Sequence, residues 1–135
     1  MLDRAIAKFE SEEEQERENI AWRLEEQHML EGLAFPIWET CRSAMEVECK
    51  KRPNHLTFEV QPNTDAVVRG AKSRKVLSVT YRPASKSIGF KCGGSGGHYS
   101  IRIEDDRQAR FWNPNRDQFL SPEDVAEELL TLLFI

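Results

Sequence analysis

The stretch from Lys75 to Glu104, KVLSVTYRPASKSIGFKCGGSGGHYSIRIE, decides the fold. It holds three segments in which apolar and polar residues alternate: KVLSVTYR (75–82), KSIGFKC (86–92) and HYSIRIE (98–104). Strict alternation is typical of β-strands with one buried face and one solvated face. The connections PASK and GGSGG are short and rich in turn-forming residues, so each strand should pair with the next in an antiparallel meander. The rest of the chain must then cover the apolar face of this meander.

Further strands are predicted on both sides of the meander. HLTFEVQ (His55–Gln61) alternates in the same way, and AVVR (Ala66–Arg69) is a candidate short strand. ARFWN (Ala109–Asn113) is the expected last strand, because Asn113-Pro114-Asn115 ends it. The sheet should therefore have five or six strands.

Helices are predicted towards both ends of the sequence. Residues 2–33 lack proline and are rich in good helix formers, and Pro36 is well placed to begin a second helix that reaches about Lys51. Ser121 and Pro122 provide an N-cap and a first-turn proline for a C-terminal helix. Together the elements predict a two-layer α+β fold, in which N-terminal helices and a C-terminal helix cover one face of the antiparallel sheet.

The first 33 residues differ from the others in pattern. They predict an acidic, partly projecting helix, whereas residues 34–135 predict a single α+β domain. The segment ESEEEQEREN (10–19) has no apolar residue, and it follows an apolar stripe at helical spacing made by Leu2, Ile6 and Phe9. A continuous helix over this region would be about 48 Å long, which exceeds the width of a domain this size. It either packs on another molecule or is a frayed acidic extension.

Charge is unevenly distributed along the chain. The net charge is −4, but residues 1–41 carry −7, residues 42–110 carry +7, and residues 111–135 carry −4. The simpler interpretation is that acidic helices pack beside a basic sheet within the molecule. The alternative is a basic surface that binds an acidic or phosphate-bearing partner.

Cysteine usage and hydropathy indicate the class of protein. Cys41, Cys49 and Cys92 are an odd number without CxxC spacing, which argues against a disulfide framework and against a zinc site. No apolar run reaches the roughly 18 residues that a membrane span requires, and MLDRAIAKFESEEE does not read as a secretory signal. We therefore expect a cytoplasmic protein without a membrane segment.

No catalytic residue, cofactor or metal ligand is predicted. The glycine-rich segment from Gly93 to Gly97 is expected to be a flexible hairpin loop, and an anion-binding nest or a flap over a pocket are alternatives. His28, His55 and His98 lie far apart in sequence and match no metal-binding spacing. An enzyme is thus not favoured, although a small-molecule pocket under the Gly93–Gly97 loop stays open.

The polar face of the sheet offers candidate ligand-binding residues: Arg82, Lys91, His98, Arg102, Arg110 and Trp112. Basic side chains beside an aromatic ring could hold a nucleic-acid backbone and stack a base. Most of the aromatic residues of the strands, however, have the parity of the apolar face. A solvated face is therefore the simpler interpretation, and nucleic acid or another phosphate-bearing ligand is possible but not favoured.

The leading hypothesis is a non-enzymatic association module that forms a homo-oligomer or binds a protein partner. It is based on the overlong acidic helix and on an apolar C-terminus, LLTLLFI. The candidate interface residues are Leu2, Ile6, Phe9, Leu129, Leu133 and Phe134.

Overall fold

The computed structural model of the chain describes residues 1–59 and 61–135. Val60, in the predicted strand His55–Gln61, lies outside the described residues. The helical elements are α1 (Leu2–Lys51), α2 (Pro122–Thr131) and a short 3-10 helix η1 (Leu132–Phe134). The strands are β1 (Leu56–Glu59), β2 (Asp65–Gly70), β3 (Val76–Arg82), β4 (Ser87–Cys92), β5 (Ser95–Ile103), β6 (Ala109–Asn113) and β7 (Gln118–Leu120).

The strands form one antiparallel sheet in which each pairs with its neighbour in sequence, in the order β1-β2-β3-β4-β5-β6-β7. In β3 and β5 the alternating residues have the predicted faces: Leu77, Val79 and Ile101 are buried, and Ser78 and Thr80 are exposed. In β4 the alternation is incomplete, because Ser87 and Gly89 are buried as well as Ile88. The predicted α+β fold with an antiparallel sheet is confirmed. The sheet has seven strands where five or six were predicted, because β7 has only three residues, too few to show a period of two.

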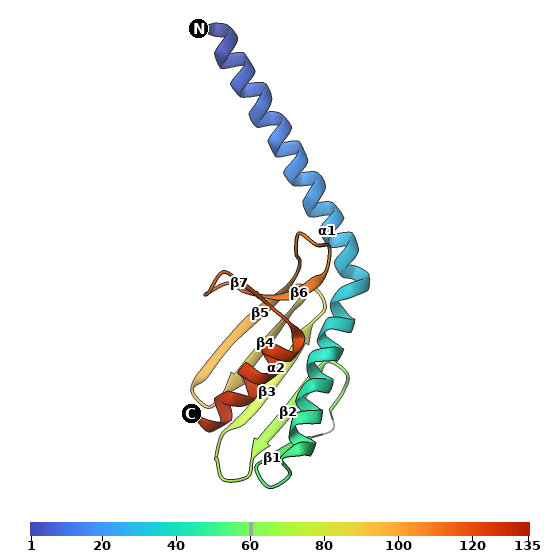
Figure 1. The fold of residues 1–135 in the computed structure, drawn as a ribbon, viewed down its shortest axis with the longest axis vertical. Coiled ribbons are helices and arrows are strands. Elements are labelled where there is room, and N and C mark those ends of the chain that lie inside the picture. The colour runs from blue at the N-terminus through green and yellow to red at the C-terminus, as the bar shows by residue number, and fades with distance from the viewer. Residues whose placement is uncertain (60) are drawn as a thin grey trace.

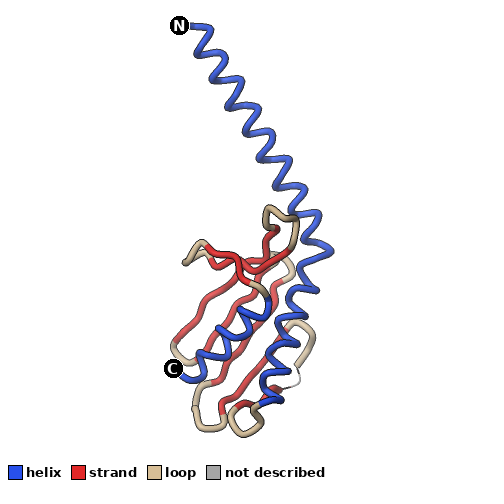
Figure 2. Tube along the Cα trace, viewed as in Figure 1, coloured by secondary structure: helices blue, strands red, loops and turns tan. Residues whose placement is uncertain are grey.

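Two layers result, since the second half of α1 and all of α2 lie on the same face of the sheet (Figure 1 and Figure 2). Trp38 of α1 is fully buried there, and its indole Nε1 donates a hydrogen bond to the carbonyl oxygen of Asn63 at 2.7 Å. Arg42, one turn further on, donates to the carbonyl oxygens of Asp65 at 3.0 Å and Gln61 at 3.1 Å. These bonds hold the helix to the β1–β2 hairpin.

The N-terminal region contains one helix where two were predicted, because α1 continues through Pro36. Proline has no backbone N–H to donate to the carbonyl of Gly32 four residues earlier, which weakens the helix locally. Figure 1 shows that the helix changes direction in its blue-green part, as expected near such a residue. Burial of Ala34 and Trp38 on either side offsets the lost bond and keeps both segments in one helix.

The C-terminal helix has the predicted start. The Ser121 hydroxyl accepts a hydrogen bond from the backbone N–H of Asp124 at 3.1 Å, and Pro122 occupies the first turn. Val125 and Leu129 of this helix are fully buried. The apolar C-terminal segment is thus docked largely on the chain's own sheet.

The predicted loop from Gly93 to Gly97 is largely strand. Only Gly93 and Gly94 form the turn between β4 and β5, and Cys92 pairs directly with Ser95. Gly93 has a φ of +60°, which glycine adopts without strain. Because Gly96 and Gly97 pair with β4, the described chain has a tight hairpin at this position and no five-residue flap.

Candidate functional site

The first part of α1 makes no contact that buries it. Every residue from Met1 to Ala21 is exposed, and we call the segment Leu2–Ala21 the arm. Its 20 residues extend about 30 Å as a helix, and Figure 1 shows them projecting beyond the sheet. Exposed pairs one turn apart, Lys8–Glu12 at 4.0 Å and Arg17–Glu13 at 3.7 Å, support the helix only weakly.

One side of the arm carries apolar residues in its first turns and again at Ile20, with Glu13 on the same side between them. Leu2, Ile6, Phe9 and Ile20, which we call the stripe, are between 46% and 73% exposed. At 3.6 residues per turn they fall within an arc of about 60° around the helix. The same arc holds Trp38, Met45 and Cys49, which are buried on the sheet. The arm therefore extends the core-facing side of α1 past the edge of the core, where none of the described residues buries it.

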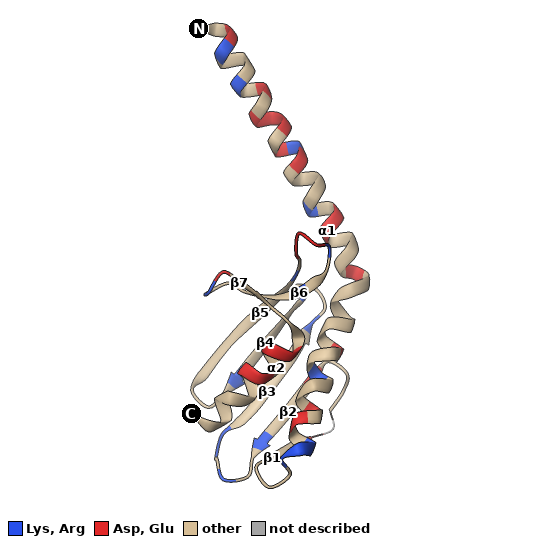
Figure 3. Ribbon diagram, in the orientation of Figure 1, with Lys and Arg blue, Asp and Glu red and all other residues tan. Residues whose placement is uncertain are grey.

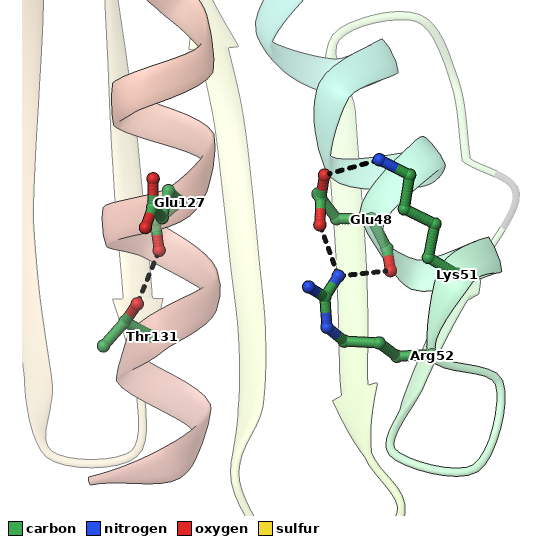
Figure 4. Close-up of polar contacts among 5 residues, drawn as sticks. All are labelled: Glu48, Lys51, Arg52, Glu127 and Thr131. Atoms are coloured by element: carbon green, nitrogen blue, oxygen red, sulfur yellow. Dashed lines mark hydrogen bonds and ion pairs between the residues drawn. The ribbon is translucent and has the colours of Figure 1, made fainter.

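An open groove of about 690 Å³ lies between α1 and α2 on the helical layer. Its apolar lining consists of Ala44, Val47, Leu56, Ala126, Leu130 and Phe134, of which Val47 and Phe134 are exposed. Figure 4 shows the two helices side by side with polar side chains along the rims. The polar lining consists of Thr40, Ser43, Glu48, Arg52, Glu123, Glu127 and Thr131. An apolar floor between polar helical walls suits the apolar face of a third helix.

The α1 rim of the groove is tied together by charge. Glu48 accepts hydrogen bonds from Arg52 and from Lys51, the latter at 3.4 Å, and Arg52 also reaches the backbone oxygen of Glu48 at 3.4 Å (Figure 4). The bond from Arg52, followed by the bond from Lys51, lowers the pKa of Glu48. On the α2 rim, Thr131 donates to the backbone oxygen of Glu127 at 2.7 Å. Among the described residues, neither the Glu123 nor the Glu127 carboxylate forms an ion pair.

Basic residues gather at the end of the molecule opposite the arm (Figure 3). They come from the last turn of α1 and the β2–β3 loop, and we call them the basic end: Lys50, Lys51, Arg52, Lys72, Arg74 and Lys75. The groove reaches this end, since Arg52 of the basic end is among its lining residues. The arm, by contrast, carries seven acidic and three basic side chains.

The outer face of the sheet holds the predicted ligand-binding residues, and two of them are already paired within the molecule. Arg102 lies 3.7 Å from a carboxylate oxygen of Glu26 and 5.7 Å from the ring centroid of Trp112. Arg110 contacts Glu104 at 3.0 Å and Asp106 at 2.8 Å. These carboxylates reduce the positive charge of the face.

The other four candidates lie on neighbouring strands. Arg82, Lys91 and His98 are exposed on β3, β4 and β5, and the Arg82 guanidinium covers Gly89, where an added Cβ would lie 2.5 Å from it. Trp112 is half-buried against Phe119, with ring centroids 4.8 Å apart. The structure brings Arg102 and Trp112 into contact, and it leaves Arg82 and Lys91 without an acidic partner among the described residues.

The predicted interface residues separate into two groups. Leu129 and Leu133 are 0% and 2% exposed, so they lie in this chain's own core. Leu2, Ile6, Phe9 and Phe134 are exposed, and Phe134 lines the groove. Only the second group is available to another chain.

Burial changes the acidity of two cysteines and one tyrosine. Burial raises the pKa of the Cys41 thiol to about 12, with a smaller contribution from Glu123, and burial likewise raises the pKa of Cys49 to about 11. Burial, together with a 2.8 Å hydrogen bond to Glu128, raises the pKa of Tyr99. Within residues 1–59 and 61–135 there is no cluster of three or more potential metal-binding side chains.

The sequence did not indicate the groove. Its two walls are about 80 residues apart in the chain, and no local pattern says that two helices will lie side by side. The available signal is composition, because Ala44 and Ala126 are small residues on otherwise large apolar faces. Two such positions are compatible with a shallow gap between helices.

Comparison with known proteins returned no matching family model, no matching curated protein and no matching solved structure. Across the part of the chain that the structure describes, no helix combines the length and apolar character needed to cross a bilayer.

Proposed function

We propose that the protein is a non-enzymatic association module that self-assembles through the arm. The observation that carries the proposal is the stripe, in which Leu2, Ile6 and Phe9 form a row of large apolar side chains on an exposed helix. Exposed apolar residues in a row mark a surface that binds another molecule, whereas scattered ones need no explanation. A helix this exposed also gains little from tertiary packing, so contact with another chain would stabilise it.

Substitution within the stripe tests the proposal. The double variant Ile6→Gln with Phe9→Gln removes two apolar side chains from the stripe. Glutamine is uncharged and a good helix former, so the net charge and the helix should be preserved. Full burial of two such side chains contributes about 3 kcal/mol or more, so self-association should weaken about 100-fold. Sedimentation velocity over a concentration series measures the change.

The matched control is Ala7→Gln with Ser11→Gln, which alters the opposite side of the same two helical turns. This control should associate like the unchanged chain. Equal weakening by both pairs of substitutions would mean that helix content, and not the stripe, controls association. A chain that stays monomeric at every concentration would refute the proposal for self-assembly.

The outer sheet face supports a second candidate function, the binding of single-stranded nucleic acid. Arg102 stacked over Trp112 is the observation that favours it, because aromatic rings and guanidinium groups together hold unpaired bases. Replacement of Arg82, Lys91 and Arg102 by Ala should abolish salt-dependent binding of a labelled oligonucleotide. Failure of the unchanged chain to bind at low salt would exclude this function.

We also propose a reducing cytoplasm as the location. The support is that all three cysteines are free and buried, and free thiols are typical of proteins kept in reducing conditions.

A further inference from the structure

We infer that the groove between α1 and α2 accepts the arm of a second copy of this chain, so that copies associate head to tail. This inference rests on the proposed self-assembly and names its acceptor surface. The supporting observations are the stripe, the apolar floor of the groove, and the opposite charges of the arm and the basic end.

The directions of the helices determine how the arm of a second copy could enter the groove. The helices α1 and α2 both run towards the basic end along the groove (Figure 1 and Figure 4). The arm projects from the other end of the molecule, with its first residues farthest from the sheet (Figure 1). A second molecule in the same orientation, placed beyond the basic end of the first, directs its arm towards the open part of this groove.

The order of charges agrees with that direction. The segment Leu2–Phe9 carries Asp3, Arg4 and Lys8, a net charge of +1, and it would lie farther along the groove, beside Glu123 and Glu127. These two carboxylates form no ion pair among the described residues. A cationic segment at that position would supply the opposite charge.

The acidic segment Glu10–Glu18 would then lie at the basic end. It carries six glutamates and Arg17, a net charge of −5, and it would face Lys51, Arg52 and the β2–β3 loop. The reverse direction would bring Glu10–Glu18 next to Glu123 and Glu127, which is electrostatically unfavourable. Parallel pairing of two arms would likewise bring one acidic segment against the other.

The length and volume of the groove are compatible with binding the first segment of the arm. The groove follows α1 from Thr40 to Arg52, about 18 Å at the helical rise, and its volume lies within the range of about 300–1,000 Å³ for binding pockets. Leu2–Phe9 needs about 11 Å of that length, so most of the arm remains to span the gap to its own sheet. A contact of this kind joins two different surfaces, so it produces chains of copies, or rings if the rotation closes.

A mixing experiment tests the inference, because a head-to-tail contact joins two different surfaces. One variant can therefore lose the arm surface while another loses the groove surface. The first variant, Ile6→Gln with Phe9→Gln, has a defective arm and an intact groove. The second, Ser43→Arg with Val47→Arg, has an intact arm, and its new side chains fill the groove beside Glu123 and Glu127. Ser43 and Val47 are both exposed, so these changes leave the core untouched.

The control for the second variant is Glu39→Arg. It also adds two units of positive charge to an exposed position on α1, but Glu39 does not line the groove. Circular dichroism and thermal unfolding verify that each variant is folded. Val47→Arg alone replaces the double variant if the latter unfolds.

Sedimentation velocity on the full-length variants gives the answer. We expect the unchanged chain and Glu39→Arg to self-associate, and each double variant alone to associate at least tenfold more weakly. A 1:1 mixture should form a species of twice the 15.6 kDa chain mass and no larger, since one functional arm meets one functional groove.

Two results would overturn the inference while leaving arm-driven assembly intact. One is undiminished self-association of Ser43→Arg with Val47→Arg, which would show that the arm binds elsewhere. The other is a mixture that stays monomeric, which would show that an intact arm on one copy and an intact groove on another do not suffice for contact. A monomeric unchanged chain would instead refute the proposed self-assembly itself.

Discussion

At the scale of single residues, close packing explains why the sequence has glycine at position 97. Gly97 on β5 pairs with Phe90 on β4, and a Cβ there would lie 2.9 Å from the Phe90 ring. The ring is also held 5.6 Å from Tyr99, centroid to centroid, which restricts its movement. Gly97→Ala should therefore destabilise the fold by about 1 kcal/mol, measured by urea unfolding. Gly94→Ala is the control, since a Cβ at Gly94 has nothing within 4 Å; equal effects would contradict this account.

Burial also determines cysteine chemistry. Because burial raises the pKa of Cys41 to about 12, the thiol is protonated in the folded chain while the unfolded chain ionises near pH 9. Stability from this group is complete below pH 9 and is lost as pH rises from about 9 to 12. A disulfide reagent at pH 8 should therefore leave Cys41 unlabelled in the folded protein and label it after unfolding in urea. Rapid labelling in the folded state would show that Cys41 is accessible.

At the scale of elements, two local features of the helices make testable contributions. Ser121 caps α2 through the N–H of Asp124, so Ser121→Ala should lower the free energy of unfolding by about 1 kcal/mol. Thermal and urea unfolding measure this loss, and Ser11→Ala in the exposed arm is the control without a cap. An unchanged midpoint would mean that the first turn of α2 is held by packing alone.

Gly32 makes the opposite contribution within α1. It is exposed in the helix interior, and a Cβ there has nothing within 4 Å. Gly32→Ala should stabilise the protein by about 0.5–1 kcal/mol, because alanine has less backbone freedom to lose. Destabilisation would indicate that the bend near Pro36 depends on glycine.

The elements also show what a sequence can predict. The alternating faces of β3 and β5 follow from residue parity, and the start of α2 follows from Ser121 and Pro122. The continuity of α1 through Pro36 depends on tertiary burial of Trp38, which local rules do not contain. The groove was missed for a related reason, since it depends on two helices that meet only in the folded chain.

At the scale of the whole molecule, charge is separated between two ends. The acidic arm and the basic end are opposite one another (Figure 3), and their charges are largely exposed. Contacts between such surfaces in different copies are screened by salt. Self-association should therefore weaken as sodium chloride rises from about 0.1 M to about 1 M, over which the Debye length falls from about 10 Å to 3 Å. Association that is unaffected by salt would indicate a purely apolar contact.

The arm itself is the central claim, and deletion tests it most directly. Residues 1–21 are exposed, whereas Trp22 and Leu30 pack on the core, so a chain that begins at Trp22 should keep the fold. Light scattering after size exclusion should find the full chain as an oligomer and the shortened chain as a monomer with an unchanged near-ultraviolet spectrum. A monomer in both cases, or the same oligomer in both, would contradict assembly through the arm.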